Sequence, residues 1–133
     1  MNEKYQQTCD NLLALLQGLK TNLATFAESN DLTASQMWTL YILLNGATTM
    51  GKLATMLHCD ASNVTGIVDR LVAQDLITSE ISPSDRRAKV LTLTTNGRHL
   101  VESYLHELPH HLGIERLSDT DRSNLHSIVV KMQ

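Results

Sequence analysis

The sequence predicts a mainly α-helical fold that carries one small β-hairpin. Three observations predict it. Apolar residues recur with helical spacing along most of the 133 residues, capping residues precede several of these segments, and one segment, residues 76–94, is rich in β-forming residues around a turn. With 42% hydrophobic residues the chain can bury the core of one domain. We therefore expect residues 1–133 to form a single domain.

A long amphipathic helix is expected near the N-terminus. Its apolar or semi-apolar residues follow one another at spacings of four and three, the heptad pattern of a coiled-coil seam: Tyr5, Cys9, Leu12, Leu16, Leu19, Leu23 and Phe26. Such a stripe needs a partner along its whole length, and a helix this long can extend beyond a small domain. Part of the seam is therefore expected to contact another subunit.

Two shorter helices are expected next. Thr33 and Gln36 have the spacing of a capping box, and the helix that follows is expected to end in a left-handed cap at Asn45 and Gly46. A third helix is expected over Met50–Leu57.

The fourth expected helix has an unusual outer face. Asp60 is its N-cap, and one side is apolar: Val64, Ile67, Val68, Leu71 and Val72. The opposite side and its flanks carry Ser62, Asn63, Thr65, Gly66, Asp69 and Arg70. That face begins with small hydrogen-bonding residues instead of the long Glu and Lys side chains that usually solvate a helix.

A β-hairpin with a basic edge follows this helix. Residues 76–81 and 88–94 have strand composition, and Pro83, Ser84 and Asp85 provide turn chemistry between them. From Ser82 to Arg98, Asp85 is outnumbered by basic residues: Arg86, Arg87, Lys89 and Arg98. This edge is therefore basic although the chain has a formal net charge of -3.

Two more helices complete the predicted fold. Thr94 or Thr95 is expected to cap a fifth helix that leads to Pro109, and Ser118 with Asp121 marks the start of a sixth. Two helices joined by a tight turn and followed by a basic hairpin form a winged helix-turn-helix. In that arrangement the second helix enters the major groove of DNA, and Arg86 and Arg87 reach over the phosphates into the adjacent minor groove. Asp85 is expected to orient one of the arginines.

The sequence resembles the multiple-antibiotic-resistance regulator (MarR) family over nearly its whole length. The matching stretches are LTASQMWTL (residues 32–40), GKLATMLHCDASNVTGIVDRLVAQDLI (51–77) and DRRAKVLTLTTNG (85–97). The resemblance implies a homodimer formed by helices in residues 1–29 and 95–133, and a DNA-binding lobe in residues 32–94. It also implies double-stranded DNA with a pseudo-palindromic operator as the partner, most often repression, and a small-molecule effector that changes the spacing of the two recognition helices.

The resemblance also carries individual positions. Ser62, Asn63, Thr65 and Gly66 align with the base- and phosphate-facing start of the recognition helix, Arg70 with a basic position near the DNA backbone, and Arg86 and Arg87 with the wing. With Lys89 from the basic edge, these are the candidate DNA-binding residues. Gly66 departs from the larger polar or basic residue often found there. Recognition of the operator is therefore expected to depend more on the wing and on DNA shape.

Other functional classes have weaker support in the sequence. Enzyme motifs such as a glycine-rich phosphate loop or a GxSxG turn are absent, so neither an enzyme nor a cofactor is predicted. The longest apolar runs are far shorter than the roughly 20 residues that span a bilayer, and a cytoplasmic location is expected. A winged-helix module that binds protein instead of DNA remains the alternative, because the chain is acidic overall.

A narrower alternative is a regulator that responds to zinc or peroxide. Cys9 lies where the family's peroxide sensors hold a thiol, but it also falls on the heptad seam, where packing is favoured. His106 and His110 are four residues apart, as metal ligands on one helix face can be, although Pro109 disturbs that geometry and no further ligands are evident. No metal site is predicted.

Overall fold

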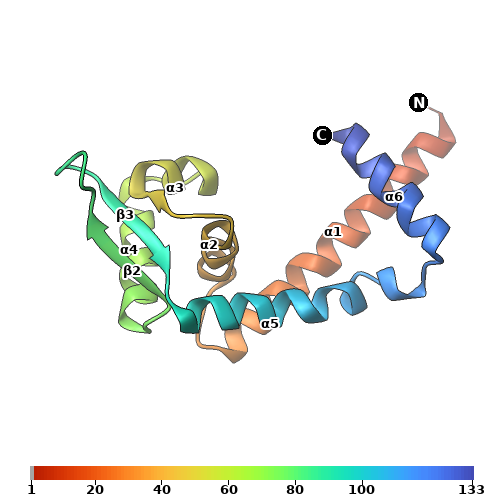
Figure 1. The fold of residues 1–133 in the computed structure, drawn as a ribbon. Helices are drawn as coiled ribbons and strands as arrows, with labels where there is room; N and C mark the ends of the chain where they lie inside the picture. Colours follow the sequence, from red (N-terminus) through yellow and green to blue (C-terminus); the bar gives the residue numbers. More distant parts are fainter. Residues whose placement is uncertain (1) are drawn as a thin grey trace. The chain divides into compact units, whose positions relative to one another are not determined.

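The computed structural model of the chain describes residues 2–133 and is mainly helical (Figure 1). Its helices are α1 (Glu3–Ser29), α2 (Ala34–Leu44), α3 (Met50–Leu57), α4 (Ala61–Ala73), α5 (Thr95–His111), the 3-10 helix η1 (Ile114–Arg116) and α6 (Asp119–Met132). Its strands are β1 (Thr48–Thr49), β2 (Ile77–Ile81) and β3 (Lys89–Leu93). The contacts divide the chain into two units. Residues 23–104 form the first, and the described residues up to Asn22 together with Leu105–Gln133 form the second.

The predicted helix starts are confirmed by their capping hydrogen bonds. Thr33 and Gln36 form the complete capping box, in which the Gln36 N–H donates to Thr33 Oγ1 (3.2 Å) and the Thr33 N–H donates to Gln36 Oε1 (2.9 Å). The N-caps of α4, α5 and α6 are Asp60, Thr94 and Ser118. Thr94 is the residue that caps α5, because its Oγ1 accepts from the Gly97 N–H at 3.0 Å.

The helix ends differ from the expectation. Asn45 follows α2 with a right-handed backbone (φ -82°), and the positive φ of +139° at Gly46 lies outside the left-handed helical region, so the predicted left-handed cap is wrong. Left-handed residues instead end α1, α3 and α4, at Asp31, His58 and Asp75. Aspartate and histidine adopt this conformation more often than most other residues with a side chain do.

The sheet has three antiparallel strands in the order β1-β3-β2. Ile77 pairs with Leu93 and Ile81 with Lys89, which confirms the hairpin, while Thr48 of β1 pairs with Leu91 on the other edge of β3. Figure 1 shows the hairpin projecting beside α3 and α4. The largest fully buried side chains of this unit come from the helices and the sheet: Met37, Leu40, Leu53, Val64, Leu71, Ile77, Leu91 and Val101. Val72, on the apolar side of α4, is 43% exposed at the margin of this core.

Hydrogen bonds join the turn that follows α4 to the start of α5. Asp75 accepts from the Thr94 hydroxyl through its carbonyl (2.6 Å) and from the Asn96 amide through its carboxylate (3.0 Å), while the Thr94 N–H donates to the Leu76 carbonyl (3.1 Å). Gly97 is buried in this junction, and a Cβ at this position would overlap the Leu76 carbonyl oxygen. The absence of a side chain therefore allows α5 to pack directly on the turn that follows α4.

We expect Gly97→Ala to lower the free energy of unfolding by about 1–3 kcal/mol, because the backbone must shift to accept the methyl group. Gly51→Ala is the matched control, since a Cβ there meets nothing within 4 Å. Chemical denaturation of the two variants and the wild type measures the difference. Equal stability of the two alanine variants would contradict the close packing at Gly97.

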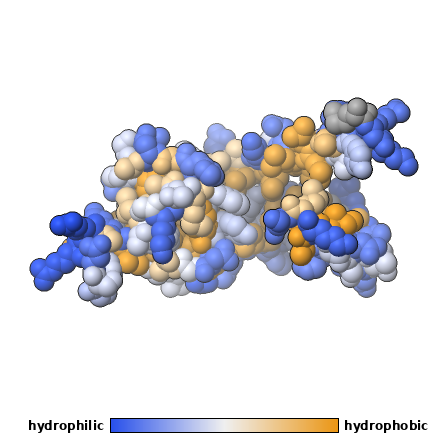
Figure 2. Space-filling model, turned by 90° about the horizontal axis from the view of Figure 1, so that it is seen from above, coloured by the Kyte–Doolittle hydropathy of each residue, from blue (hydrophilic) through white to orange (hydrophobic). Residues whose placement is uncertain are grey.

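The second unit exposes apolar side chains on two helices. Residues of α1 and α6 that are 40–64% exposed are Leu12, Leu13, Leu15, Leu16, Leu125, Ile128, Val129, Val130 and Met132. In Figure 2, apolar surface is visible in the right-hand part of the view, where Figure 1 shows these helices. Cys9 on the same seam is also exposed. Contiguous apolar surface of this kind indicates a face that another molecule covers.

Candidate nucleic-acid interface

The first turn of α4 is organised by its N-cap. The Asp60 carboxylate accepts the Asn63 N–H (2.9 Å) and the Ser62 hydroxyl (2.9 Å). These hydrogen bonds, that of the Asn63 backbone first, hold the pKa of the Asp60 carboxyl below its ordinary value. The Ser62 hydroxyl proton is therefore directed to the cap and away from solvent.

Thr65 and Gly66, the next positions on the outer face of α4, differ in the groups that they expose to solvent. Thr65 is exposed, but its hydroxyl donates to the Ala61 carbonyl at 2.8 Å. Gly66 is also exposed, and a Cβ added there would meet nothing within 4 Å. The fold therefore does not require glycine at position 66. Its effect is to leave the helix backbone uncovered at this point of its outer face.

Arg70 is bound within the chain. Its Nη2 donates to the Asp31 carbonyl at 3.3 Å, and Gln74 Nε2 donates to the same oxygen at 3.2 Å. Asp31 is the left-handed residue between α1 and α2, so these bonds join the second half of α4 to that turn. Arg70 thus has a structural partner in addition to its predicted place near the DNA backbone.

The wing, which we define as residues 77–93, presents its arginines at an ordered turn. Asp85 Oδ1 accepts the Arg87 backbone N–H (2.9 Å), and the Asp85 carbonyl accepts the Ala88 N–H (3.1 Å). Asp85 therefore shapes the turn through the backbone, whereas the expectation was contact with a guanidinium. Arg86 and Arg87 are exposed, and within residues 2–133 neither forms an ion pair.

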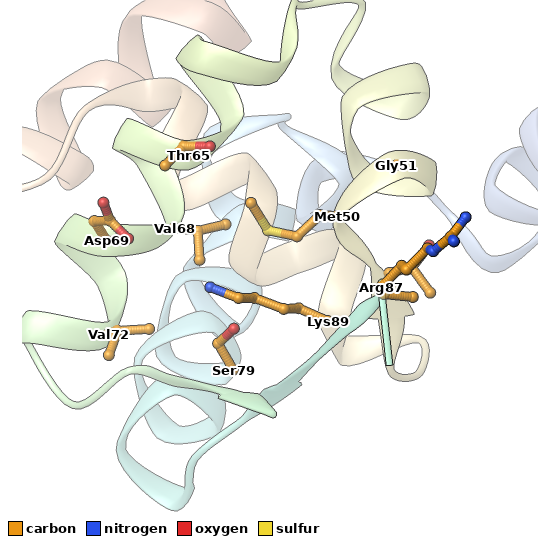
Figure 3. Close-up of a pocket in the computed structure, with 11 residues that line it drawn as sticks. Met50, Gly51, Thr65, Val68, Asp69, Val72, Ser79, Arg87 and Lys89 are labelled. Atoms are coloured by element: carbon orange, nitrogen blue, oxygen red, sulfur yellow. The ribbon is translucent and has the colours of Figure 1, made fainter. Parts of the chain in front are cut away.

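A cavity of about 690 Å³ separates α4 from the wing (Figure 3). It brings together three of the predicted residues, Thr65, Arg87 and Lys89. Figure 3 shows the Lys89 side chain extending from β3 across the cavity towards α4, whereas Arg87 points away from α4. Two other predicted residues, Asn63 and Gly66, line a separate cavity of about 440 Å³ beside α2. The candidate residues therefore occupy both flanks of α4.

Several residues that line the larger cavity were not predicted from the sequence. They are Thr49, Met50 and Gly51 at the start of α3, Val68, Asp69 and Val72 of α4, Ser79 of β2 and Ala88 of the wing. Helical spacing places Asp69 on the outer face of α4, four residues after Thr65, but it was not among the candidate DNA-binding residues. The α3 residues carry no such signal, because their proximity to the wing arises from the pairing of β1 with β3.

The histidines and cysteines considered as metal ligands or redox sensors lie outside any arrangement suited to a metal ion in the described residues. Within residues 2–133, no group of three or more His, Cys, Asp or Glu side chains is arranged to hold a metal ion. His110 Nδ1 lies 3.2 Å from Glu115 Oε2, and α5 continues past Pro109 to His111. Cys9 and Cys59 are free thiols. In the part of the chain that the structure describes, no helix combines the length and apolar character needed to cross a bilayer.

The structural comparisons give the same fold. The apo form of wild-type MarR from E. coli aligns with a TM-score of 0.75 at 23% identity, covering 92% of this chain and 93% of that one. AbsC, a MarR family transcriptional regulator from Streptomyces coelicolor, aligns with a TM-score of 0.71 at 21% identity over 99% and 93% of the two chains. A point mutant of S. aureus MepR, bound to an oligodeoxyribonucleotide, gives 0.64 at 22% identity over 99% and 96%.

The sequence comparisons find one similar regulator and one family model that matches part of the chain. YhbI of Bacillus subtilis (strain 168), an uncharacterised HTH-type transcriptional regulator, is 31% identical over 99 residues, which are 74% of this chain and 64% of YhbI. The chain thus spans slightly less than two thirds of this relative. The MarR family model matches residues 32–89, which include α2, α3, α4 and most of the wing. Over residues 32–89 the chain is therefore similar to the MarR family, and it has the winged-helix fold of the MarR structures.

Proposed function

We propose that the protein is a homodimeric, sequence-specific DNA-binding transcription regulator. The observation that carries the proposal is the arrangement of α4 and the wing in one unit, on either side of the cavity that Thr65, Arg87 and Lys89 line. Arg86 and Arg87 are exposed and form no ion pair within residues 2–133. A helix and a cationic loop at this separation suit the major groove and the adjacent minor groove of one duplex. The match of residues 32–89 to the MarR family model supports the same function.

The exposed apolar faces of α1 and α6 support a second copy of this chain as the partner. The heptad seam of α1 includes Leu12 and Leu16, which are 44% and 47% exposed. An identical chain offers the same seam, and a two-fold axis buries both copies at once. The dimer presents two α4 helices and two wings, so its operator is a pseudo-palindrome with half-sites about one turn of DNA apart.

The family resemblance supports repression and a response to a small molecule. The dimer has one form whose two α4 helices are spaced for the operator and another form in which they are not. An effector that binds the second form more tightly lowers the affinity for DNA, at most by the ratio of its affinities for the two forms. A cytoplasmic location follows from the proposal, because the regulator must reach the genome.

Selection of bound fragments from genomic DNA tests the proposed function. The full-length protein is mixed with sheared DNA of its source organism at low salt, and retained fragments are sequenced and retested in the presence of excess competitor DNA. We expect a few fragments that share an inverted repeat and survive competition. Retention of no fragment, or of fragments without any common sequence, would instead favour the alternative in which the winged helix holds another protein.

A further inference from the structure

We infer that this protein reads A·T-rich half-sites, and that the Asn63 carboxamide selects an adenine in the major groove. The inference rests on the proposed function and specifies its substrate. It depends on which polar side chains on the first two turns of α4 keep their hydrogen-bonding groups available for a base.

Most of the polar groups there are already engaged. The Ser62 hydroxyl donates to Asp60, and the Thr65 hydroxyl donates to the Ala61 carbonyl. Gly66 has no side chain to offer. In contrast, Asn63 uses only its backbone N–H in the cap, and within residues 2–133 its exposed carboxamide makes no hydrogen bond.

A free asparagine carboxamide has a specific base partner. It can donate to N7 and accept from the N6 amino group of adenine at the same time, a bidentate pair that guanine cannot offer because its O6 is an acceptor. Thr65 supports the same preference. Since its hydroxyl is turned to the Ala61 carbonyl, its methyl group is the part available to a base, and the partner for a methyl group is the thymine C5-methyl.

A guanine reader is missing from the same surface. Bidentate recognition of guanine N7 and O6 uses Arg or Lys, and α4 has neither before Arg70. Arg70 lies in the second half of the helix and donates to the Asp31 carbonyl, as does Gln74. Asp69, the remaining charged residue of α4, lines the cavity that Lys89 crosses. A G·C pair opposite the first turns of α4 therefore meets no matching side chain.

The wing favours the same base composition through the shape of the DNA. A·T tracts narrow the minor groove and deepen its negative potential, which attracts arginine. Arg86 and Arg87 are exposed and, within the described residues, free of ion pairs, so their charges are available for such a groove. The direct readout by α4 and the indirect readout by the wing thus both select A·T pairs.

Selection from a random DNA library with the full-length protein tests this inference. We expect half-sites in which one adenine is nearly invariant and the flanking pairs are mainly A·T. Replacement of that adenine by guanine should weaken wild-type binding about 5- to 100-fold. The Asn63→Ala variant should bind the selected site more weakly than the wild type does, and it should lose most of the discrimination between adenine and guanine. Asn63→Arg should shift the preferred base at that position towards guanine.

Gln17→Ala is the matched control, because it removes an exposed carboxamide from α1, which is outside α4 and the wing, and leaves Asn63 in place. It should keep the adenine preference, and circular dichroism should show all three variants folded. Selected half-sites with a G·C core, or an adenine preference unchanged in Asn63→Ala, would overturn the inference but leave the proposed function standing. A library from which nothing is selected would overturn both.

Discussion

Replacement of Arg86 and Arg87 together by alanine is expected to weaken operator binding about 10³-fold at 0.15 M salt. Each cation that neutralises a DNA phosphate contributes about -0.9 to the slope of log affinity against log salt concentration. At 0.15 M salt this contribution corresponds to about fivefold in affinity for each cation. The dimer loses four such cations when both arginines are removed from each wing. The magnitude of the slope should therefore fall by about three to four, and binding should weaken on all sequences alike.

Arg98→Ala is the matched control for this loss of charge. Arg98 lies on α5, where its Nη1 is 3.7 Å from Glu102 Oε1, and it belongs to neither α4 nor the wing. We expect its slope to equal that of the wild type. Binding titrations at several salt concentrations on one operator compare the variants. If the wing variant kept the wild-type slope, the arginines could not be contacting DNA and the role assigned to the wing would be wrong.

The second large effect is expected at the dimer interface. Leu12→Glu combined with Leu16→Glu should convert the dimer to a monomer at micromolar concentration. Each leucine is about half exposed in the single chain, and in the proposed dimer the partner copy would bury it, so that each substitution acts twice across the two-fold axis. At about 0.7–1.5 kcal/mol for burying the exposed half of each leucine side chain, four such losses amount to about 3–6 kcal/mol, which weakens a micromolar dimer by roughly 10²- to 10⁴-fold.

Gln17→Glu controls for the added negative charge. Gln17 is exposed and follows Leu16 directly, at a heptad position that faces away from the seam. Sedimentation equilibrium should show a dimer for the wild type and for Gln17→Glu, and a monomer for the double leucine variant. A monomeric wild type, or a double variant that remains dimeric, would show that the α1 seam does not join two copies.

Much of the fold could be predicted from sequence because its signals are local. Capping residues such as Thr33, Asp60 and Ser118 act on groups three positions away, so their spacing is visible in the chain. The strand β1 was missed because two residues cannot show an alternating pattern, and its pairing with β3 joins positions far apart in sequence. The left-handed residues Asp31, His58 and Asp75 were missed because this conformation is most common for glycine and asparagine, and these positions carry neither.

The position of the candidate residues on α4 and the wing could be predicted from the sequence, but the contacts of their side chains could not. The outer face of α4 follows from helical periodicity, yet only the structure shows the Ser62 and Thr65 hydroxyls engaged within the helix. The contact of Arg70 with Asp31 spans 39 positions, and no local pattern reveals it. Lys89 was grouped with the wing arginines by charge, but its side chain crosses the cavity towards α4 while Arg87 points away.

Hydroxyl-radical footprinting on a selected operator tests the central claim most directly, because it reports which parts of the duplex the two α4 helices and two wings cover. We expect protected segments in two half-sites about one helical turn apart on one face of the DNA, flanked by minor-groove protection that disappears in the Arg86→Ala and Arg87→Ala double variant. Protection confined to one half-site, or protected segments on opposite faces of the duplex, would contradict the account.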